Sequence, residues 1–492
     1  MKIVILAGGG GNRLFPLSRA MFPKQFLKLN NSVSLLAQTI GRFLPLVEPS
    51  DLVIVTNQDY LYLVESELRA CHAQEAHILL EPVARNTAPA IAFAVRYCID
   101  ALGCPEDEVL FVTPSDHLIS PLDKFAENVR QAVDLARSHK IVTLGIQPNS
   151  PETGYGYIKV GQPFGKGFKV DSFREKPDRA TAESYLAAGG YFWNSGMFAF
   201  TIACFRQELR AHRGDLYALA DTDLDQMRRD FAGMPNISFD YAVAEKSAQV
   251  VMLPLKAEWT DIGSWDAVHD VFKKDADGNV LIGDCLQIEC SNTLMLGENR
   301  LIAGIGLEDI LVVETGDVIV VTRKGESQKV KDLVNELTAN RRAEAREHLT
   351  VNQPWGIYTV LDSGPGFKTK KIIVNPGQSP GLQMHYHCSE HWIIVSGTAS
   401  VSIDGNQRVL CENESVFVPQ KTWHRLDNPG LSQLVIIAVQ NGTDLGGDNA
   451  AGFEDVYETQ DAVLDQERQA YDQLRMEDDT AICGQYISRS SV

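Results

Sequence analysis

Residues 1–28 read MKIVILAGGGGNRLFPLSRAMFPKQFLK and decide how the first half of the chain folds. The apolar run at residues 2–7 has the length of a buried strand, and four glycines follow it: Gly8, Gly9, Gly10 and Gly11. Because glycine lacks a Cβ atom, a ligand can approach this backbone closely, and its N–H groups can converge on phosphate oxygens. Arg13 and Lys24 add positive charge. The stretch therefore indicates a nucleotide site, with a tight turn and solvated basic residues as the structural alternative.

The loop matches neither of the common glycine-rich nucleotide motifs. G-x-G-x-x-G needs a third glycine at a helix start, where Arg13 and Leu14 follow instead, and no Gly-Lys-Ser/Thr closes a Walker A loop. The pattern GG-x-G-x-R-L-x-P-L-S-R-x-x-x-P-K-Q-F resembles the signature of sugar-phosphate nucleotidyltransferases, and more narrowly that of mannose-1-phosphate guanylyltransferases. This resemblance implies an α/β, Rossmann-like nucleotidyltransferase domain, here expected over residues 1–270, and it places Arg19 in the same basic cluster.

The composition of the whole chain narrows the classes of function. At 492 residues the chain is too long for a single core, so two or three domains are expected. A net charge of −19 argues against nucleic acid or an anionic membrane as a partner. Nine cysteines without a C-x-x-C pair predict reduced thiols and a cytoplasmic location, and no apolar run is long enough to span a membrane. We also expect a homo-oligomer.

Between residues 1 and 270, short apolar runs alternate with segments of helical spacing. The runs at 52–55, 109–112 and 141–144 predict strands, and the segments 88–101 and 124–137 predict helices. Such alternation is typical of a mostly parallel sheet covered on both faces. Ligands of these sheets collect at the carboxyl ends of the strands, and the candidate residues lie at or just after such runs.

The loop at residues 81–89 is a candidate for base recognition. A carboxylate can accept hydrogen bonds from guanine N1–H and its 2-amino group together, which adenine and pyrimidines do not offer in that arrangement. The family resemblance implies that Glu81 reads the guanine and that Arg85 and Asn86 lie near the nucleotide. In the structural alternative, Asn86 or Thr87 only caps the next helix.

Two aspartates far apart in the sequence are candidate metal ligands. Asp116 and Asp261 each follow an apolar run, and nucleotidyl transfer needs Mg²⁺ held by one or two carboxylates together with the substrate phosphates. Each alone is equally explained as a turn former. Together with the glycine loop, they match the metal-binding positions of the family.

Three short segments between these aspartates can contact a sugar. Gly154 and Tyr155 precede a strand-like run, Glu175 and Lys176 place opposite charges side by side, and Asn194 adds an amide within an aromatic run. The structural alternatives are a hairpin turn, a surface ion pair and a core strand. The F-x-E-K-P resemblance implies that Lys176 binds the sugar phosphate, while Glu175 and Asn194 bind the sugar.

The second half of the chain has a different residue pattern, which predicts β-structure. Residues 275–349 predict a small β-domain, which the family resemblance makes β-helix-like, followed by a charged linker helix at 329–349 with a solvated face. Residues 351–457 predict a compact β unit, and residues 458–492 an acidic helical tail.

Four of the eleven histidines lie between residues 385 and 424. Their spacing resembles the two motifs of cupin β-barrels, H-x-H-x(3,4)-E-x(6)-G and P-x-G-x(2)-H-x(3)-N, with Lys421 in place of the second motif's glycine. The resemblance predicts a site for Zn²⁺ or another divalent ion. Its ligands would be Gln383, His385, Glu390 and His424, with His387 as a competing ligand.

This C-terminal unit resembles the type II phosphomannose isomerase domain, which interconverts fructose 6-phosphate and mannose 6-phosphate. The chain departs from that pattern at Cys388 and Gly452, where arginines are usual, at Ala438 in place of Glu, and at residues 458–459 in place of Gly-Arg. Losing cationic contacts of about 1.5–3 kcal/mol each would weaken binding of a phosphosugar dianion strongly. We therefore expect a retained metal site with weak or absent isomerase activity.

Together these features predict transfer of GMP from GTP to mannose 1-phosphate, giving GDP-mannose and pyrophosphate. The catalytic residues would be Arg13, Lys24, Asp116, Lys176 and Asp261. One alternative is a different base or sugar 1-phosphate. Another, from a different class, is that the cupin-like unit is a ligand-binding or assembly module.

Overall fold

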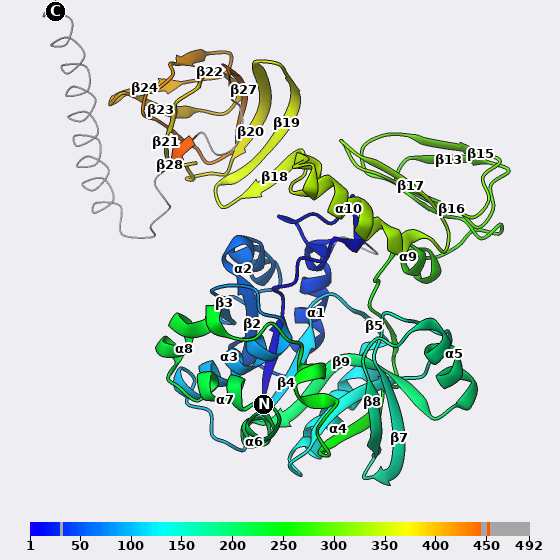
Figure 1. Cartoon of the computed structure of the whole chain (residues 1–492). Coiled ribbons are helices and arrows are strands. Elements are labelled where there is room, and N and C mark those ends of the chain that lie inside the picture. The colour runs from blue at the N-terminus through cyan, green and yellow to red at the C-terminus, as the bar shows by residue number, and fades with distance from the viewer. Residues whose placement is uncertain (30–32, 444–449, 453–492) are drawn as a thin grey trace, which may run out of the picture. The chain divides into compact units, whose positions relative to one another are not determined.

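The computed structural model describes residues 1–29, 33–443 and 450–452. The chain divides into two compact units, residues 1–348 and 349–492 (Figure 1). The predicted acidic tail at 458–492 lies outside the described residues.

A nine-stranded sheet organises the first unit, in the order β3-β2-β1-β4-β9-β6-β10-β8-β7. β1 pairs in parallel with β2 and β4, β2 with β3, and β6 with β10. The predicted parallel sheet is thus confirmed, but β9 runs antiparallel between β4 and β6, and β7 and β8 add an antiparallel edge. The strands are β1 Lys2–Leu6, β2 Leu52–Asn57, β3 His77–Glu81, β4 Val109–Pro114, β6 Ile141–Ile146, β7 Tyr157–Phe164, β8 Gly167–Arg174, β9 Tyr191–Thr201 and β10 Val250–Pro254.

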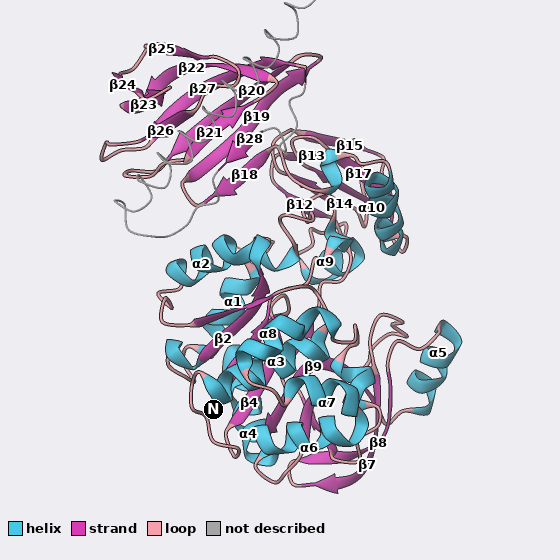
Figure 2. Ribbon diagram, turned by 60° about the vertical axis from the view of Figure 1, so that its left-hand side comes forward, coloured by secondary structure: helices cyan, strands magenta, loops and turns pink. Residues whose placement is uncertain are grey.

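Helices cover both faces of this sheet (Figure 2). Alternation along β1 explains why: Ile3 and Ile5 enter one core, and Val4 enters the other. The first core is closed by α1 Leu35–Phe43, α2 Leu61–Ala70 and α4 Leu122–Ala136. The second is closed by α3 Thr87–Asp100, α6 Ile202–His212, α7 Gly214–Ala220 and α8 Leu224–Asp230. A further helix, α5 Arg179–Ala188, follows β8.

The predicted β-helix-like region is present as two small sheets of mainly parallel strands. β12 Val280–Ile282, β14 Leu294–Gly297 and β16 Ile310–Glu314 pair in parallel, and β17 Ile319–Arg323 closes that sheet antiparallel. β13 Cys285–Ile288 and β15 Ile302–Ile305 form the second sheet. The predicted linker helix is shorter than expected, with α10 at Val330–Ala339 and a 3-10 turn at Ala343–Ala345.

This region shares a hydrophobic core with the segment that follows the glycine loop. The core joins Leu14 and Phe15 to Trp265 of α9 (Trp265–Val271), to the strands β12, β14, β16 and β17, and to α10. Arg19 is fully buried at the edge of this core, with its guanidinium over the Phe15 ring. Its guanidinium donates two hydrogen bonds to Asp317, each 2.6 Å long, and one to the Glu347 carbonyl. Arg19 is therefore an internal anchor paired with Asp317, a partner that the sequence did not indicate.

The second unit consists of two antiparallel sheets, the arrangement expected of a cupin barrel (Figure 1). One contains β18 Thr350–Gln353, β19 Gly356–Gly364, β20 Phe367–Val374, β27 Leu434–Gly442, β22 Cys388–Ser396 and β25 Ser415–Val418. The other contains β24 Asn406–Leu410, β23 Ala399–Ile403, β26 His424–Asp427, β21 Leu382–His385 and β28 Ala450–Gly452. Lys421, at the motif's glycine position, adopts φ +55°, a backbone conformation that favours glycine.

Candidate functional site

The glycine loop leaves β1 and packs against two of the predicted site residues. A Cβ atom added at Gly8 would lie 2.6 Å from Glu81 Oε2, and one at Gly11 would lie 3.2 Å from Lys24 Cβ. A side chain at Gly8 would therefore displace the Glu81 carboxylate and one at Gly11 would crowd Lys24, whereas Gly9 has open space around it. The buried Gln25, which the sequence reading missed, fixes the loop by donating to the Ala7 and Gly9 carbonyls at 2.9 and 3.0 Å.

Glu81 ends β3 beside the loop, because β3 pairs with β2 and β2 with β1. Its side chain is buried and its Oε1 has no hydrogen-bond partner among the described residues. Burial raises the pKa of Glu81 to about 7. Of its predicted neighbours, Asn86 caps α3 by accepting from Thr87 N–H, and Arg85 donates to the Ala232 carbonyl. Both interactions are structural, and Asn86 remains exposed.

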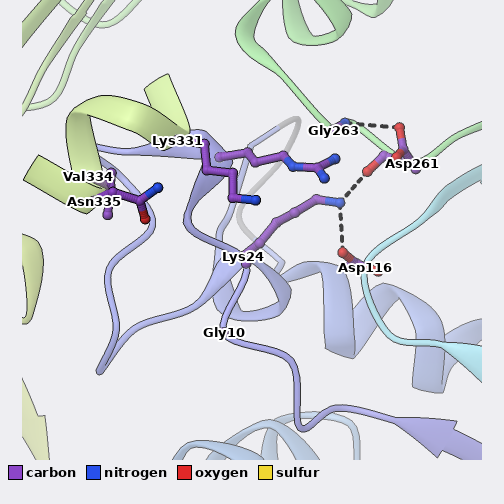
Figure 3. A pocket seen from close by; sticks show the side chains of 10 residues that line it. Gly10, Lys24, Asp116, Asp261, Gly263, Lys331, Val334 and Asn335 are labelled. Carbon is purple, nitrogen blue, oxygen red and sulfur yellow. Dashed lines mark hydrogen bonds and ion pairs between the residues drawn. The ribbon is translucent and has the colours of Figure 1, made fainter. Parts of the chain in front are cut away.

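A cavity of about 380 Å³ opens beyond the loop (Figure 3). This cavity brings together glycines of the loop, two positively charged side chains of the predicted site and both predicted aspartates. Residues of α10 line it as well. Its lining comprises Gly10, Gly11, Arg13, Lys24, Asp116, Asp261, Gly263, Lys331, Val334 and Asn335.

Lys24 joins the two aspartates at this cavity. Its ammonium lies 2.7 Å from Asp116 Oδ2 and also donates to the Asp261 carbonyl (Figure 3). Burial opposes ionisation of Asp116, but the Lys24 charge prevails and holds the pKa of Asp116 below its usual range. Asp116 is therefore a carboxylate at neutral pH, as a metal site requires.

A short antiparallel ribbon explains why residues so far apart in sequence meet. β5, Leu118–Ser120, follows Asp116 and pairs with β11, Glu258–Thr260, which precedes Asp261. Asp261 Oδ1 then accepts hydrogen bonds from the Tyr155 hydroxyl at 2.7 Å and from Gly263 N–H at 2.9 Å. These contacts orient its carboxylate at the cavity.

His117 is a buried neighbour of Asp116 that the sequence reading did not assign. Trp259 Nε1–H donates to His117 Nδ1 at 3.1 Å, and because indole only donates, the imidazole proton must lie on Nε2. Burial lowers the pKa of His117 to about 4, so the ring is neutral at neutral pH. Its Nε2 is 3.9 Å from Asp116 Oδ1. His117 therefore lies beside Asp116 as a neutral ring, at a distance too long for a hydrogen bond.

The predicted sugar-side residues form a second cluster. Lys176 Nζ lies 2.8 Å from Glu175 Oε1, and a Cβ atom at Gly156 would lie 2.4 Å from Glu175 Oε2. A side chain at Gly156 would therefore displace the Glu175 carboxylate, whereas Gly154 lies exposed with open space around it.

Asn194 and Asp240 complete this cluster. The Asn194 amide donates to Asp240 Oδ1 and accepts from the Thr143 hydroxyl, both at 2.8 Å. Burial and the nearby Glu175 raise the pKa of Asp240 to about 6. The sequence reading missed Asp240, because no spacing links it to Asn194; a π-helical turn at Asp240–Ala244 brings it there.

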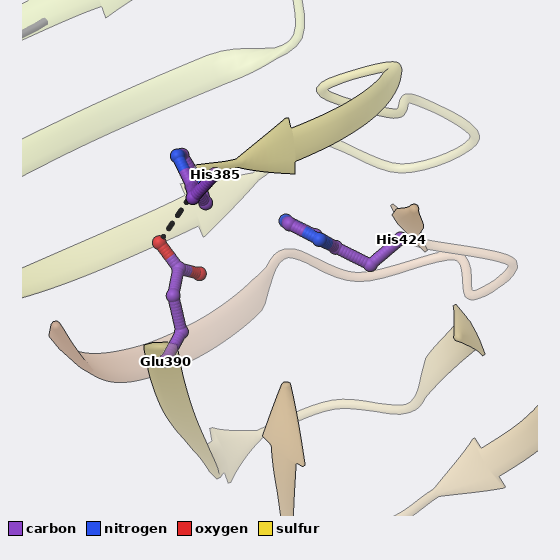
Figure 4. A group of neighbouring side chains, drawn as sticks. All are labelled: His385, Glu390 and His424. Carbon is purple, nitrogen blue, oxygen red and sulfur yellow. Dashed lines mark ion pairs between the residues drawn. The ribbon is translucent and has the colours of Figure 1, made fainter. Parts of the chain in front are cut away.

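In the second unit, His385, Glu390 and His424 come together with their ligand atoms within 4.8 Å of one another (Figure 4). His385 Nε2 lies 3.1 Å from Glu390 Oε1, and the histidine's charge and hydrogen bond outweigh burial and lower the pKa of Glu390 to about 2. His424 Nδ1 is 2.9 Å from the Thr422 carbonyl, so it carries the proton and leaves the Nε2 lone pair free. That buried Nε2 has no partner among the described residues.

The other two predicted ligands differ in position. His387 is exposed and lies outside this group, so it is not the ligand that the fold favours. Gln383 sits opposite His424 in the strand pairing, but its amide donates to the Pro380 carbonyl at 3.3 Å. Cys388 and Ala438, which replace family residues, are both buried.

Three protein families match successive parts of the chain. Residues 2–278 match the family described as Nucleotidyl transferase, residues 283–337 the MannoseP isomerase/GMP-like beta-helix domain, and residues 340–455 the Mannose-6-phosphate isomerase C-terminal family.

Relatives are similar over nearly their whole length. A protein of Vibrio cholerae described as a putative mannose-1-phosphate guanylyltransferase is 42% identical over 467 residues, covering 92% of this chain and 99% of the relative. The mannose-1-phosphate guanylyltransferase of Escherichia coli is 40% identical, covering 92% and 98%. The alginate biosynthesis protein AlgA of Pseudomonas aeruginosa is 43% identical, covering 92% and 96%.

A solved structure shows the same fold in the first unit. A Thermus thermophilus protein described as mannose-1-phosphate geranyltransferase superposes with a TM-score of 0.63 at 32% identity, covering 68% of this chain and 99% of that one. No helix in the described residues is both long and apolar enough to cross a membrane.

Proposed function

This chain belongs to the mannose-1-phosphate guanylyltransferase family, and from that membership and its site we propose that it converts GTP and mannose 1-phosphate to GDP-mannose and pyrophosphate. The observation that carries the proposal is the cavity where Lys24 joins Asp116 and Asp261 next to the glycine loop. Although the chain as a whole is acidic, positively charged side chains and carboxylates lie here around the backbone of the glycine loop, which a triphosphate can approach.

In the proposed reaction, an oxygen of the sugar phosphate attacks the α-phosphorus of GTP in line, and the bond to the β-phosphate oxygen breaks. Catalysis then depends on positioning and on neutralising charge. The glycine loop and Arg13 hold the phosphates, Lys24 stabilises charge near the α-phosphate, and Lys176 orients the attacking phosphate. None of these steps needs a covalent enzyme intermediate.

Nucleotidyl transferases use divalent metal ions, and the donors present fit one. Asp116 and Asp261 supply carboxylate oxygens, the ligand type that Mg²⁺ prefers. Asp116 is already ionised beside Lys24, and the orientation of Asp261 is fixed by Tyr155 and Gly263. We propose that these two aspartates hold Mg²⁺, which would neutralise phosphate charge when bound.

Glu81 is the proposed reader of guanine. Its buried Oε1 lacks a partner among the described residues, and an unsatisfied buried oxygen is stabilised by a ligand that donates to it. Guanine N1–H and its 2-amino group are such donors. On the sugar side, we assign mannose to Glu175 and Asn194, next to Tyr155.

For the second unit, we propose a divalent metal site formed by His385, Glu390 and His424, with Gln383 as a further ligand. Two imidazoles and a carboxylate suit Zn²⁺ or a similar ion. Because Cys388 and Ala438 supply no charge where the isomerase pattern has charged residues, we propose that isomerase activity is weak or absent. The unit would then serve as a binding or assembly module.

We further propose that the protein works in the cytoplasm as a homo-oligomer. None of the eight cysteines in the described part of the chain forms a disulfide, which suits a reducing compartment.

One experiment tests these proposals together: pyrophosphate release over a panel of nucleoside triphosphates and sugar 1-phosphates, with fructose 6-phosphate isomerisation run in parallel. We expect release with GTP and mannose 1-phosphate, little isomerisation, and a large loss of turnover in Asp116→Asn with little change in thermal unfolding. A preference for another pair would overturn the substrate assignment. Full turnover in Asp116→Asn would remove the metal assignment, and ordinary isomerase turnover would refute the proposal for the second unit.

A further inference from the structure

One wall of the nucleotide cavity comes from α10, which the sequence indicated as a solvated linker helix. Lys331, Val334 and Asn335 all line the cavity. Lys331 and Asn335 are four residues apart, so they lie one helical turn apart on the same face. Figure 3 shows the Lys331 side chain extending toward Lys24.

The position of this wall is fixed by packing. Val330 and Val334 of α10 are buried in the same core as Leu14, which directly follows Arg13. The placement of Lys331 relative to Arg13 therefore follows from a shared hydrophobic core and does not depend on a loose connection.

Lys331 brings to this cavity a positive charge that no carboxylate in the described part of the chain neutralises. Lys24 is already paired with Asp116, and the nearby Lys329 pairs outside the cavity with Glu326. In the described part of the first unit, Lys331 forms no ion pair with an acidic side chain. It is exposed to the cavity, where its charge is available to an anionic ligand.

The direction of the reaction indicates which part of the ligand this charge meets. In-line displacement places the leaving pyrophosphate opposite the incoming sugar phosphate. The hydroxyl of Tyr155, which we assign to the sugar side, donates a hydrogen bond to Asp261. In Figure 3, Asp261 and the α10 residues lie on opposite sides of Lys24. The α10 side is therefore the side from which pyrophosphate departs.

We propose that Lys331, assisted by Asn335, binds the β- and γ-phosphates of GTP and the departing pyrophosphate, so that α10 completes the nucleotide site. This inference rests on the proposed guanylyltransferase function and adds a binding residue to it. Lys331 touches the substrate's outer phosphates and not the reacting α-phosphorus. Its removal should therefore act mainly on nucleotide binding.

The test compares Lys331→Gln, Lys331→Arg and Asn335→Ala with the matched control Lys329→Gln in the full chain. Steady-state kinetics should give an about tenfold higher KM for GTP in Lys331→Gln, as expected for losing one partly solvated charge-assisted contact. The affinity of Lys331→Gln for inorganic pyrophosphate, measured by calorimetric titration, should fall in parallel. The KM for mannose 1-phosphate should change little. Lys331→Arg should retain most of the affinity for GTP and pyrophosphate, and Asn335→Ala should lose less of it than Lys331→Gln. Lys329→Gln should match the wild type.

Unchanged GTP and pyrophosphate affinities in Lys331→Gln would overturn the inference, as would an equal loss in Lys329→Gln. Failure of the proposed function would look different, because the wild type itself would release no pyrophosphate from GTP and mannose 1-phosphate. The pyrophosphate titration needs no turnover, so it decides the role of Lys331 in either case. Because Lys331 is exposed, its replacement should leave thermal unfolding unchanged.

Discussion

Local surroundings give single residues of this site their chemical character. Burial opposes ionisation of both Glu81 and Asp116, yet their pKa values shift in opposite directions. Asp116 faces the Lys24 ammonium and stays ionised, whereas Glu81 pairs with no cation among the described residues and burial raises its pKa to about 7. The identity of the neighbour, and not the residue type, decides how readily each carboxyl ionises.

Glu81→Gln should impair GTP use more than ATP use. The glutamine keeps the shape of the side chain but replaces one acceptor with a donor that faces a guanine donor. We expect the KM for GTP to rise by about tenfold or more, since a buried charge-assisted pair is lost. Pyrophosphate release with GTP and with ATP measures the change, and the exposed Glu75→Gln is the matched control.

The pH dependence provides a second measurement on the same residue. Only ionised Glu81 accepts from both guanine donors, and burial places its pKa at about 7 in the free protein. The KM for GTP should therefore rise as the pH falls through about 7, and Glu81→Gln should lose that dependence. A GTP profile that is the same in both proteins would contradict the assignment.

At the scale of elements, Arg19 links the segment after the glycine loop to the β-helix-like region. Its buried guanidinium meets Asp317, which follows β16, and the Glu347 carbonyl. Burial opposes ionisation of Asp317, but the hydrogen bonds from Arg19 prevail and lower its pKa. A carboxyl with a lowered pKa stabilises the fold at neutral pH, and that contribution is lost as the pH falls below its usual value of about 4.

Arg19→Ala should destabilise the first unit strongly. Removing one partner of a buried ion pair typically costs about 3–5 kcal/mol, because the other polar groups lose their partner. Thermal unfolding should shift down markedly, whereas Arg137→Ala, which breaks an exposed pair with Asp134, should change stability by less than about 1 kcal/mol. Equal midpoints for the two variants would show that Arg19 is not an anchor.

The packing of elements also explains how residues distant in the sequence come together at the cavity beside the glycine loop. The β5–β11 ribbon brings Asp116 and Asp261 together, and the core beneath α10 brings Lys331 to the cavity. Both depend on contacts between segments distant in sequence. No local pattern in residues 329–349 reveals that one face of this helix meets a glycine loop near the start of the chain.

For the whole molecule, the division into two units sets where the chain can be cut. Unit one ends at His348, although the isomerase-like family match begins at residue 340. The intervening segment belongs to the first unit, because the Ala345 and Arg346 carbonyls accept from Ala20 and Met21 N–H and the His348 ring bonds to the Leu17 carbonyl.

A fragment of residues 1–348 should therefore fold and retain pyrophosphate release from GTP and mannose 1-phosphate. A fragment of residues 1–339 should be less stable, because it loses the acceptors for Arg19, Ala20 and Met21. Thermal unfolding and the transferase assay compare the two fragments. An inactive but folded 1–348 fragment would mean that the second unit is needed for the transferase site.

Much of this architecture could be predicted from local sequence, because its signals are local. The strand-length apolar runs, the helical spacing of residues 88–101 and 124–137, and the cupin spacing ending at His424 each lie within a few turns or strands. The antiparallel insertion of β9 between β4 and β6 was not predictable, since strand order depends on pairing between distant segments.

By itself, the sequence determined the residue types available for chemistry and the segments that carry them: a glycine loop after a strand, carboxylates at strand ends, and a spaced set of histidines. Only the tertiary structure decided which of them meet. It paired Lys24 with Asp116, buried Arg19 in a core, excluded His387 from the metal-ligand group, and added Asp240 and Lys331. The physical reason is that charge state and hydrogen bonding depend on distance in space, which a linear pattern fixes only within one element.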